Sequence, residues 1–347
     1  MRYFTQSDDL RFYKDPVSFD KHTQKDVLKY AIGANMYMPA IQDNIFCKLI
    51  HNKFHDIGAV TLCMEDAIEE QDLPKAQISA LKLLDALYEE RKKHPDLELP
   101  LIFIRVRNEK QFSVFSGMLE KRHLESLAGF NFPKFNSMNG NAYFEILKSL
   151  SEKYGEVLYG MPIIEDKSVI YKEERFAELH RIQNILAGYD KYVLNIRVGG
   201  TDFSSIYGLR RRADMTIYDI KVVSDCLKDI INFFLRQEYG YVVSGPVWEY
   251  FSWDEDSAEI QGLKKELALD IQNGFHGKTI IHPSQIDIVN REYIIKYEEY
   301  MDACSIIGMN GGVAKSYAGN RMNEANPHKN WAKKILAKAE VFGVMDV

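Results

Sequence analysis

Acidic side chains follow several short apolar runs of this sequence. The adjacent carboxylates Glu65 and Asp66 come after Val60-Thr61-Leu62, while Glu165 and Asp202 follow later apolar runs. Mg²⁺ takes oxygen ligands and keeps several waters, so one or two carboxylates suffice to bind it. A softer metal is disfavoured, because no thiolate or histidine cluster accompanies the acids. The pattern indicates a site for a divalent cation.

Basic side chains stand at the ends of similar runs. Arg105 and Arg107 are two residues apart, so in a strand both lie on one face. Lys134 follows Pro133 at the end of another run. Arginine offers a planar fork to a carboxylate or phosphate, and Mg²⁺ holds negative charge as it develops on oxygen. Together these residues suit chemistry that passes through an enolate.

Each of these residues also has a purely structural interpretation. A carboxylate or arginine after a strand is most often a helix cap or a solvated strand end. Lys134 and Lys278 would normally be surface lysines, and Gly199-Gly200 and Gly245-Pro246 are common turn formers. Convergence favours function, because the carboxyl ends of all strands of a parallel barrel meet at one mouth. A charged rim without catalysis is the alternative.

Eight short apolar runs, with helical patterns between them, must position these residues. Stretches 73–91 and 219–236 have helical spacing, and the alternation predicts a TIM (β/α)8 barrel rather than an open sheet. The predicted strands are Asn35–Pro39, Ile57–Met64, Leu101–Val106, Gly129–Phe135, Leu158–Ile164, Tyr192–Val198, Tyr241–Ser244 and Thr279–Ile281.

The chain extends beyond the predicted barrel at both ends. Residues 1–30 are polar and predict an N-terminal arm or lead-in helix, and residues 31–300 form the predicted catalytic barrel. Residues 301–347 contain a glycine-bearing flap at 308–319 and a predicted helix at 330–342. A glycine-bearing loop closed by a helix is typical of a lid, so we expect a C-terminal lid and helix. A surface loop with a packing helix is the alternative.

Composition excludes several classes of function. The chain has 347 residues, of which 46% are hydrophobic, and a formal net charge of −6. Without a long basic run, a nucleic-acid partner is disfavoured. No apolar run approaches the roughly 20 residues that span a bilayer, and no signal core is visible, so we expect no membrane partner and a cytoplasmic location. The four cysteines are far apart and predict neither a disulfide framework nor a zinc site.

The segment Gly277-Lys278-Thr279-Ile280-Ile281-His282-Pro283-Ser284-Gln285, preceded by Gly245-Pro246, resembles the last two strands of the citrate lyase β-subunit-like family. This family of Mg²⁺-dependent carbon–carbon lyases includes malyl-CoA and citramalyl-CoA lyases and is related to the 2-oxo-acid aldolases. Glu65-Asp66-Ala67-Ile68 and Pro133-Lys134 resemble its motifs after strands two and four. The resemblance covers roughly residues 33–342. It implies a TIM barrel, a Mg²⁺ cofactor and a trimeric or hexameric homo-oligomer.

The resemblance also implies roles for single residues. Glu165 and Asp202 fall where the family places its metal-binding carboxylates, and Arg105 resembles its substrate-carboxylate arginine. The candidates for the proton carrier are a metal-bound water and Glu324 of the lid, from this chain or a neighbouring copy. The predicted catalytic residues are Arg105, Glu65, Asp66 and Lys134, and the predicted substrate-binding residues are Arg105, Arg107, Gly200, Thr201, Pro246 and His282.

The sequence departs from the family pattern at several positions. Cys63 stands where the acidic segment usually opens with Asp. The first strand follows Gly33-Ala34 instead of an Arg, and it ends Pro39-Ala40 instead of Pro-Gly. Asn323 or Glu324 stands in place of the lid's usual Asp. Since that Arg and Gly help hold coenzyme A in the family, a divergent branch with another substrate is indicated.

These observations predict a Mg²⁺-dependent carbon–carbon lyase acting on a small molecule through the enolate of a 2-oxo acid or acyl thioester. Two alternatives stay open. An aldolase on a phosphorylated or sugar-derived compound would use Arg197 and Arg210–Arg212 as anion contacts. A barrel that has lost catalysis and serves as a binding subunit would explain the departures, but the retained Glu165 and Asp202 argue against it.

Overall fold

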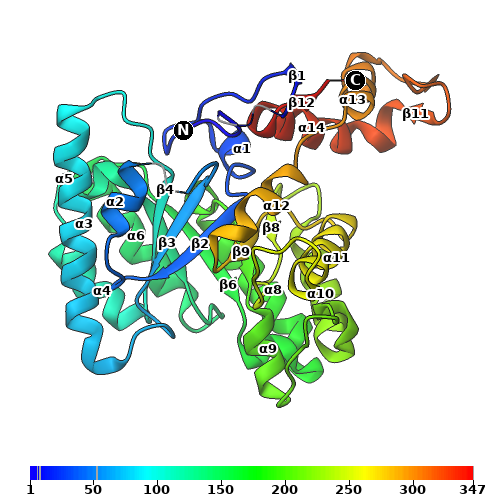
Figure 1. The fold of residues 1–347 in the computed structure, drawn as a ribbon. Helices are drawn as coiled ribbons and strands as arrows, with labels where there is room; N and C mark the ends of the chain where they lie inside the picture. The colour runs from blue at the N-terminus through cyan, green and yellow to red at the C-terminus, as the bar shows by residue number, and fades with distance from the viewer. Residues whose placement is uncertain (6, 8, 52–53, 347) are drawn as a thin grey trace.

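A closed barrel of parallel strands forms the centre of the molecule (Figure 1). The computed structural model describes residues 1–5, 7, 9–51 and 54–346. The strand order is β8-β7-β6-β5-β4-β3-β2-β9, and a parallel bridge between Gly245 and Lys278 closes the ring. The barrel strands are β2 (Ala34–Pro39), β3 (Ala59–Cys63), β4 (Leu101–Arg105), β5 (Leu127–Phe132), β6 (Tyr159–Ile164), β7 (Ile196–Val198), β8 (Val243–Ser244) and β9 (Lys278–Ile280). The TIM barrel is confirmed, and each predicted strand overlaps one of these, although the bounds differ by up to four residues, as at β7.

Helices surround the barrel (Figure 1). The predicted helices at 73–91 and 219–236 correspond to α3 and α10. No helix of the described chain is both long and apolar enough to cross a membrane. The surrounding helices are α2 (Ile45–Ile50), α3 (Leu73–Lys93), α4 (Glu109–Met118), α5 (Lys121–Ser126), α6 (Gly140–Tyr154), α7 (Lys167–Ile170), α8 (Lys172–Gly188), α9 (Gly200–Ile206), α10 (Lys221–Phe234), α11 (Ala258–Gln272) and α12 (Ile286–Arg291).

A buried ion network stands behind the last barrel strand. Lys278 has no exposed surface, and its Nζ lies 2.9 Å from Glu266 Oε1 and 2.6 Å from Asp270 Oδ2. Arg211 Nη1 pairs with Glu266 at 2.8 Å, and the Tyr218 hydroxyl donates to Asp270 at 2.7 Å. Lys278 is therefore not a surface lysine, which its residue type alone would predict. It holds α11 against the strand that closes the barrel.

The two chain ends pair with each other. The N-terminal strand β1 (Phe12–Lys14) runs antiparallel to β12 (Val344–Met345), and the short helix α1 (Lys25–Leu28) follows the arm. The C-terminal segment consists of α13 (Tyr297–Gly308), the hairpin β10 (Val313–Lys315) and β11 (Met322–Glu324), and α14 (Ala325–Phe342). The predicted helix at 330–342 is thus part of α14. The predicted domain boundaries stay predictions.

This C-terminal segment packs against the amino ends of the barrel strands, opposite the mouth (Figure 1). Phe342 stacks on Tyr3 with ring centroids 4.6 Å apart, and the Tyr3 hydroxyl donates to Ala31 O at 2.8 Å, just before β2. Phe342 also packs edge-on against His276, which precedes β9. Since these residues all precede strands, α14 and the hairpin do not cover the mouth of their own barrel.

Candidate active site

The strand ends bring the predicted acidic and basic residues into one cluster at the mouth of the barrel. Four carboxylates surround two cations. Arg105 ends β4 and Asp202 lies in α9 after β7, and the other four residues lie just after β3, β5 and β6. We call this group the mouth cluster. Its members are Glu65, Asp66, Arg105, Lys134, Glu165 and Asp202.

Arg105 is the centre of the mouth cluster. It ends β4 and is nearly buried, and its Nη2 lies 2.8 Å from Glu65 Oε2 and 3.1 Å from Glu165 Oε1. Asp66 Oδ2 is 3.5 Å from the same nitrogen. Burial lowers the pKa of Arg105, but Glu165 and Glu65 outweigh this effect and hold it well above its usual value. Arg105 therefore binds the protein's own acids through Nη2 and orients them, while its Nε is buried without a hydrogen-bond partner.

Lys134 follows β5 in an unusual backbone conformation. Its φ is +48°, which is strained for a non-glycine residue and is found most often at functional sites. This turn directs its amide to Glu165 Oε1 at 2.9 Å and its ammonium toward Glu65, with Asp202 Oδ1 at 3.6 Å. The neighbouring acids raise the pKa of Lys134 despite its partial burial. Lys134 therefore stays protonated and can stabilise negative charge rather than act as a base.

Glu165 is the most buried carboxylate of the mouth cluster. Burial raises its pKa to about 7, although Arg105 opposes this effect. Its Oε1 accepts hydrogen bonds from Arg105 and from the Lys134 amide, whereas no described residue donates to its Oε2. Gly199 makes room for this carboxylate, because a Cβ at Gly199 would lie 2.0 Å from Oε2 and 2.5 Å from the Glu165 Cβ. One oxygen is thus held by hydrogen bonds, and the other lies against Gly199.

We expect Gly199→Ala to displace Glu165 and to weaken Mg²⁺ binding about tenfold or more, with a loss of about 1–3 kcal/mol in stability. Titration calorimetry with Mg²⁺ and denaturant unfolding measure the two effects. Gly117→Ala is the control, because nothing lies within 4 Å of an added Cβ there and helix propensity should make it neutral or stabilising. Unchanged Mg²⁺ affinity in Gly199→Ala would contradict the role given to Glu165.

A cavity of about 480 Å³ opens beside the mouth cluster. Among the predicted site residues, its lining includes the four carboxylate and arginine residues Asp66, Arg105, Glu165 and Asp202, together with Thr201. Other groups in the lining are Tyr37, Cys63, Gly199 and Thr279, and one further arginine, Arg197.

Four predicted substrate-binding residues do not line this cavity. Arg107 points its guanidinium at the Ile68 carbonyl. Gly200 is packed against Pro246, whose Cβ would lie 2.8 Å from a Cβ at Gly200. His282 accepts a hydrogen bond from the Ser284 amide on Nδ1 and stacks on the Phe251 ring at 4.3 Å. Their placement favours roles in shaping loops, since close packing and local caps occupy them.

From the sequence, Arg197 was predicted to bind substrate only in the alternative function, an aldolase on a phosphorylated or sugar-derived compound. It lies in β7 with 1% of its surface exposed and reaches the cavity from below the mouth cluster. The available signal was a lone charged residue inside the apolar run Leu194–Val198, which a barrel interior tolerates only for a reason.

The carboxylates of the mouth cluster fit the ligand preferences of Mg²⁺. The Oε2 of Glu165 accepts no hydrogen bond from the described residues, and Asp202 makes one long ion pair, to Lys134. Across the described chain, no three His, Cys, Asp or Glu side chains are grouped as a complete metal cage. Mg²⁺ requires only one or two protein carboxylates and completes its shell with water and substrate. The pair Glu165 and Asp202 therefore fits Mg²⁺ better than a metal that needs several protein ligands.

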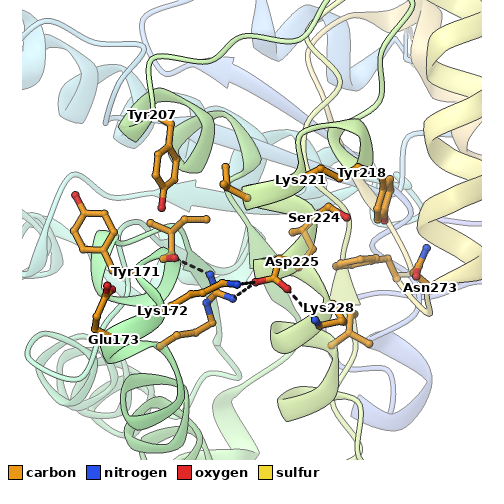
Figure 2. A pocket seen from close by; sticks show the side chains of 16 residues that line it. Tyr171, Lys172, Glu173, Tyr207, Tyr218, Lys221, Ser224, Asp225, Lys228 and Asn273 are labelled. Atoms are coloured by element: carbon orange, nitrogen blue, oxygen red, sulfur yellow. Dashed lines mark hydrogen bonds and ion pairs between the residues drawn. The ribbon is translucent and has the colours of Figure 1, made fainter.

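A larger cavity of about 930 Å³ lies on the outside of the barrel, beside α7, α8 and α10 (Figure 2). Three of its basic side chains pair with Asp225, whose Oδ2 lies 2.9 Å from Arg175 Nη1 and 3.2 Å from Lys172 Nζ, and whose Oδ1 lies 2.9 Å from Lys228 Nζ. None of the predicted site residues lines it. We therefore place the candidate active site at the mouth.

Solved structures share the fold of this chain. A citrate lyase from Burkholderia xenovorans has a TM-score of 0.64 at 14% identity, covering 91% of this chain and 94% of the other. The protein CitE from Mycobacterium tuberculosis, in complex with magnesium, acetoacetate and coenzyme A, has a TM-score of 0.57 at 18% identity, covering 90% and 99%. RipC from Yersinia pestis has a TM-score of 0.51 at 16% identity, covering 76% and 95%. At these identities the likeness concerns the fold.

Comparison with protein families is more specific. A search of the curated proteins finds no match to this sequence. A family model described as a C–C bond lyase of the TIM-barrel fold matches residues 26–344, which include every barrel strand and the whole mouth cluster. The chain therefore belongs to the family of carbon–carbon bond lyases with the TIM-barrel fold.

Proposed function

We propose that this carbon–carbon lyase depends on Mg²⁺ and cleaves or forms a bond next to the carbonyl of a 2-oxo acid or acyl thioester. The observation that carries the proposal is the mouth cluster itself, in which four carboxylates and two cations meet at the carboxyl ends of the strands. Asp66, Arg105, Glu165 and Asp202 of this cluster line the cavity beside it. In TIM barrels this face holds the chemistry.

The proposed roles follow from the contacts. Glu165 and Asp202 would hold Mg²⁺, which when bound polarises a substrate carbonyl and stabilises negative charge on its oxygen. Arg105 favours the ionised forms of Glu65 and Glu165 against the effect of burial and orients both carboxylates, so we assign it a positioning role besides any contact with substrate. Lys134 adds a positive charge at the mouth, where negative charge develops during bond cleavage.

The substrate class is proposed from the cavity and from similar structures. The cavity of about 480 Å³ suits a small acid. One similar structure, with a TM-score of 0.51 at 18% identity, is a citrate lyase β-subunit from M. tuberculosis complexed with oxaloacetate and magnesium. We propose a 2-oxo acid as the first substrate class to test. A CoA thioester is the second, because the first strand lacks the family's Arg and Gly.

The proton carrier also has a structural constraint. Glu324 ends β11, and the C-terminal segment packs at the end of the barrel opposite the mouth (Figure 1). A role for Glu324 would therefore require a second copy of the chain, in line with the proposed homo-oligomer. A water held at the metal site is the other proposed carrier and needs no partner.

The test of this function is isothermal titration of the whole protein with oxaloacetate, pyruvate and acetyl-CoA, each with and without Mg²⁺. We expect an oxo acid to bind in the presence of Mg²⁺ and at least tenfold more weakly in its absence, since the acid-rich mouth repels an anion until the metal is bound. Cleavage of the bound acid is then followed by product analysis.

Each other outcome has a definite meaning. Binding of acetyl-CoA as well would indicate that the substrate is a CoA thioester. Mg²⁺ binding without turnover of any of these compounds or of sugar phosphates would favour the inactive binding subunit. Binding of no ligand, with or without metal, would contradict the proposed function.

A further inference from the structure

Arg197 is a buried cation without an acidic partner. It lies in β7 with 1% exposure, and its Nη2 donates to Thr279 Oγ1 at 2.6 Å. Its guanidinium lies 5.8 Å from the centre of the Tyr37 ring. Its Nε and Nη1 are buried without a hydrogen-bond acceptor, and no carboxylate of the described residues is within ion-pair distance. Such an uncompensated charge is costly to bury.

The other buried arginines show how this protein normally handles such a charge. Among the described residues, buried arginines stand at four positions. Arg105 pairs with Glu65 and Glu165, Arg175 with Asp225 and Asp229, and Arg211 with Glu266. Arg197 is the exception. The Tyr37 hydroxyl does not replace the missing acid, because burial raises its pKa and keeps it neutral.

The position of Arg197 relates it to the metal-binding pair. Arg197 is in register with Ile163 of β6, two residues before Glu165, so it lies one layer deeper in the barrel. Two strand residues correspond to roughly 7 Å along the barrel. Arg197, Tyr37 and Thr279 line the same cavity as Glu165 and Asp202. A short acid could thus place one end at the carboxylate pair and the other at Arg197.

We infer that Arg197 binds a second oxyanion of the substrate, a carboxylate or a phosphate-type group, and so selects a small dianionic acid over a monoacid. This inference rests on the proposed function, because it assumes that the 2-oxo acid end lies at Glu165 and Asp202. The guanidinium still has hydrogen-bond donors without a partner on Nε and Nη1, and its charge favours an oxyanion as the acceptor. The Thr279 hydroxyl, which accepts from Nη2, keeps its own hydrogen to donate.

The test compares ligands that differ only at the second group. With saturating Mg²⁺, oxaloacetate and 3-phosphonopyruvate carry a second carboxylate and a phosphonate, and pyruvate carries neither. We expect the wild-type protein to bind one of the two dianions about tenfold to a hundredfold more tightly than pyruvate, as charged hydrogen bonds allow. The better of the two identifies the oxyanion. In Arg197→Met this preference should disappear, while pyruvate and Mg²⁺ bind as before.

A stability measurement separates recognition from a structural role. If Arg197 serves a ligand, Arg197→Met should leave the melting temperature of the ligand-free protein unchanged or raised, because it removes an uncompensated charge. Arg175→Met is the matched control, since it strips a buried arginine from Asp225 and Asp229 and should lower the melting temperature. A drop with Arg197→Met as large as in this control would overturn the inference, and so would a retained dianion preference.

A further arm distinguishes failure of this inference from failure of the proposed function. If no 2-oxo acid binds with Mg²⁺, the proposed function fails, and malonate and inorganic phosphate are then titrated without metal. Stabilisation of the wild type but not of Arg197→Met by either anion would keep Arg197 as an anion site. No stabilisation of the wild type would remove the inference as well.

Discussion

Glu165→Gln is expected to weaken Mg²⁺ binding at least about 100-fold and to abolish metal-dependent turnover without unfolding the protein. The neutral amide keeps the shape of the side chain, and its oxygen can still accept from Arg105 and from the Lys134 amide. The group that would face the metal loses its charge, however. Loss of a residue that merely supports a metal ligand already costs 10- to 100-fold in affinity, so loss of a ligand should cost more.

The thermal stability of Glu165→Gln, in contrast to its Mg²⁺ affinity, should rise or stay unchanged. Burial raises the pKa of Glu165 to about 7, because it destabilises the ionised carboxylate in the metal-free protein. Asp166→Asn is the matched control, because Asp166 caps α7 through the Ser168 amide at 2.9 Å, and asparagine caps equally well. Calorimetry with Mg²⁺ and thermal unfolding measure both variants. Wild-type affinity in Glu165→Gln would remove Glu165 from the metal site.

Lys278→Met is expected to destabilise the fold by about 3–5 kcal/mol, the cost of leaving buried charges unpaired. The substitution keeps the volume of the side chain but leaves Glu266 with Arg211 and Asp270 with the Tyr218 hydroxyl. Denaturant unfolding measures the loss. Because Lys278 also forms the bridge to Gly245, the loss should concentrate where the barrel closes.

The pH dependence identifies the cause of this loss. Burial raises the pKa of Asp270 to about 6 even with Lys278 beside it, so removal of the lysine should raise it further. The folded variant then binds a proton that the unfolded chain, with an ordinary Asp pKa, has released. The deficit should therefore shrink as pH falls from 8 toward 5.5, and Lys278→Met with Asp270→Asn should recover part of it. A deficit that does not change with pH would point to packing instead.

The sequence predicted those features that depend on local pattern. Apolar runs near 34–39 and 278–280 are strands because they are bounded by turn residues and alternate with helical periodicity. Once a parallel barrel is expected, the meeting of Glu65 with Lys134 and of Arg105 with Glu165 follows from topology, since all carboxyl ends share one face.

Features that depend on side-chain partners across the barrel could not be predicted in the same way. Lys278 and Arg197 are both single charges in apolar strands, yet one has two acids and the other has none. The distinction depends on α11, which supplies Glu266 and Asp270 outside the barrel, while Arg197 faces inward. The position of the C-terminal segment could not be predicted either, because its contact with Tyr3 joins parts of the chain that are distant in sequence.

The pairing of β1 with β12 has a consequence for biosynthesis. Residue 12 leaves the ribosome before any strand of the barrel, but its partner, residue 345, is made only after all of them. During translation β1 therefore has no strand to pair with, and the aromatic residues of the N-terminal arm stay exposed to solvent while the barrel folds. The packing of Tyr3 against Phe342 is then possible only after α14 has been made. The sheet of β1 and β12 is therefore completed only after the barrel strands have been made.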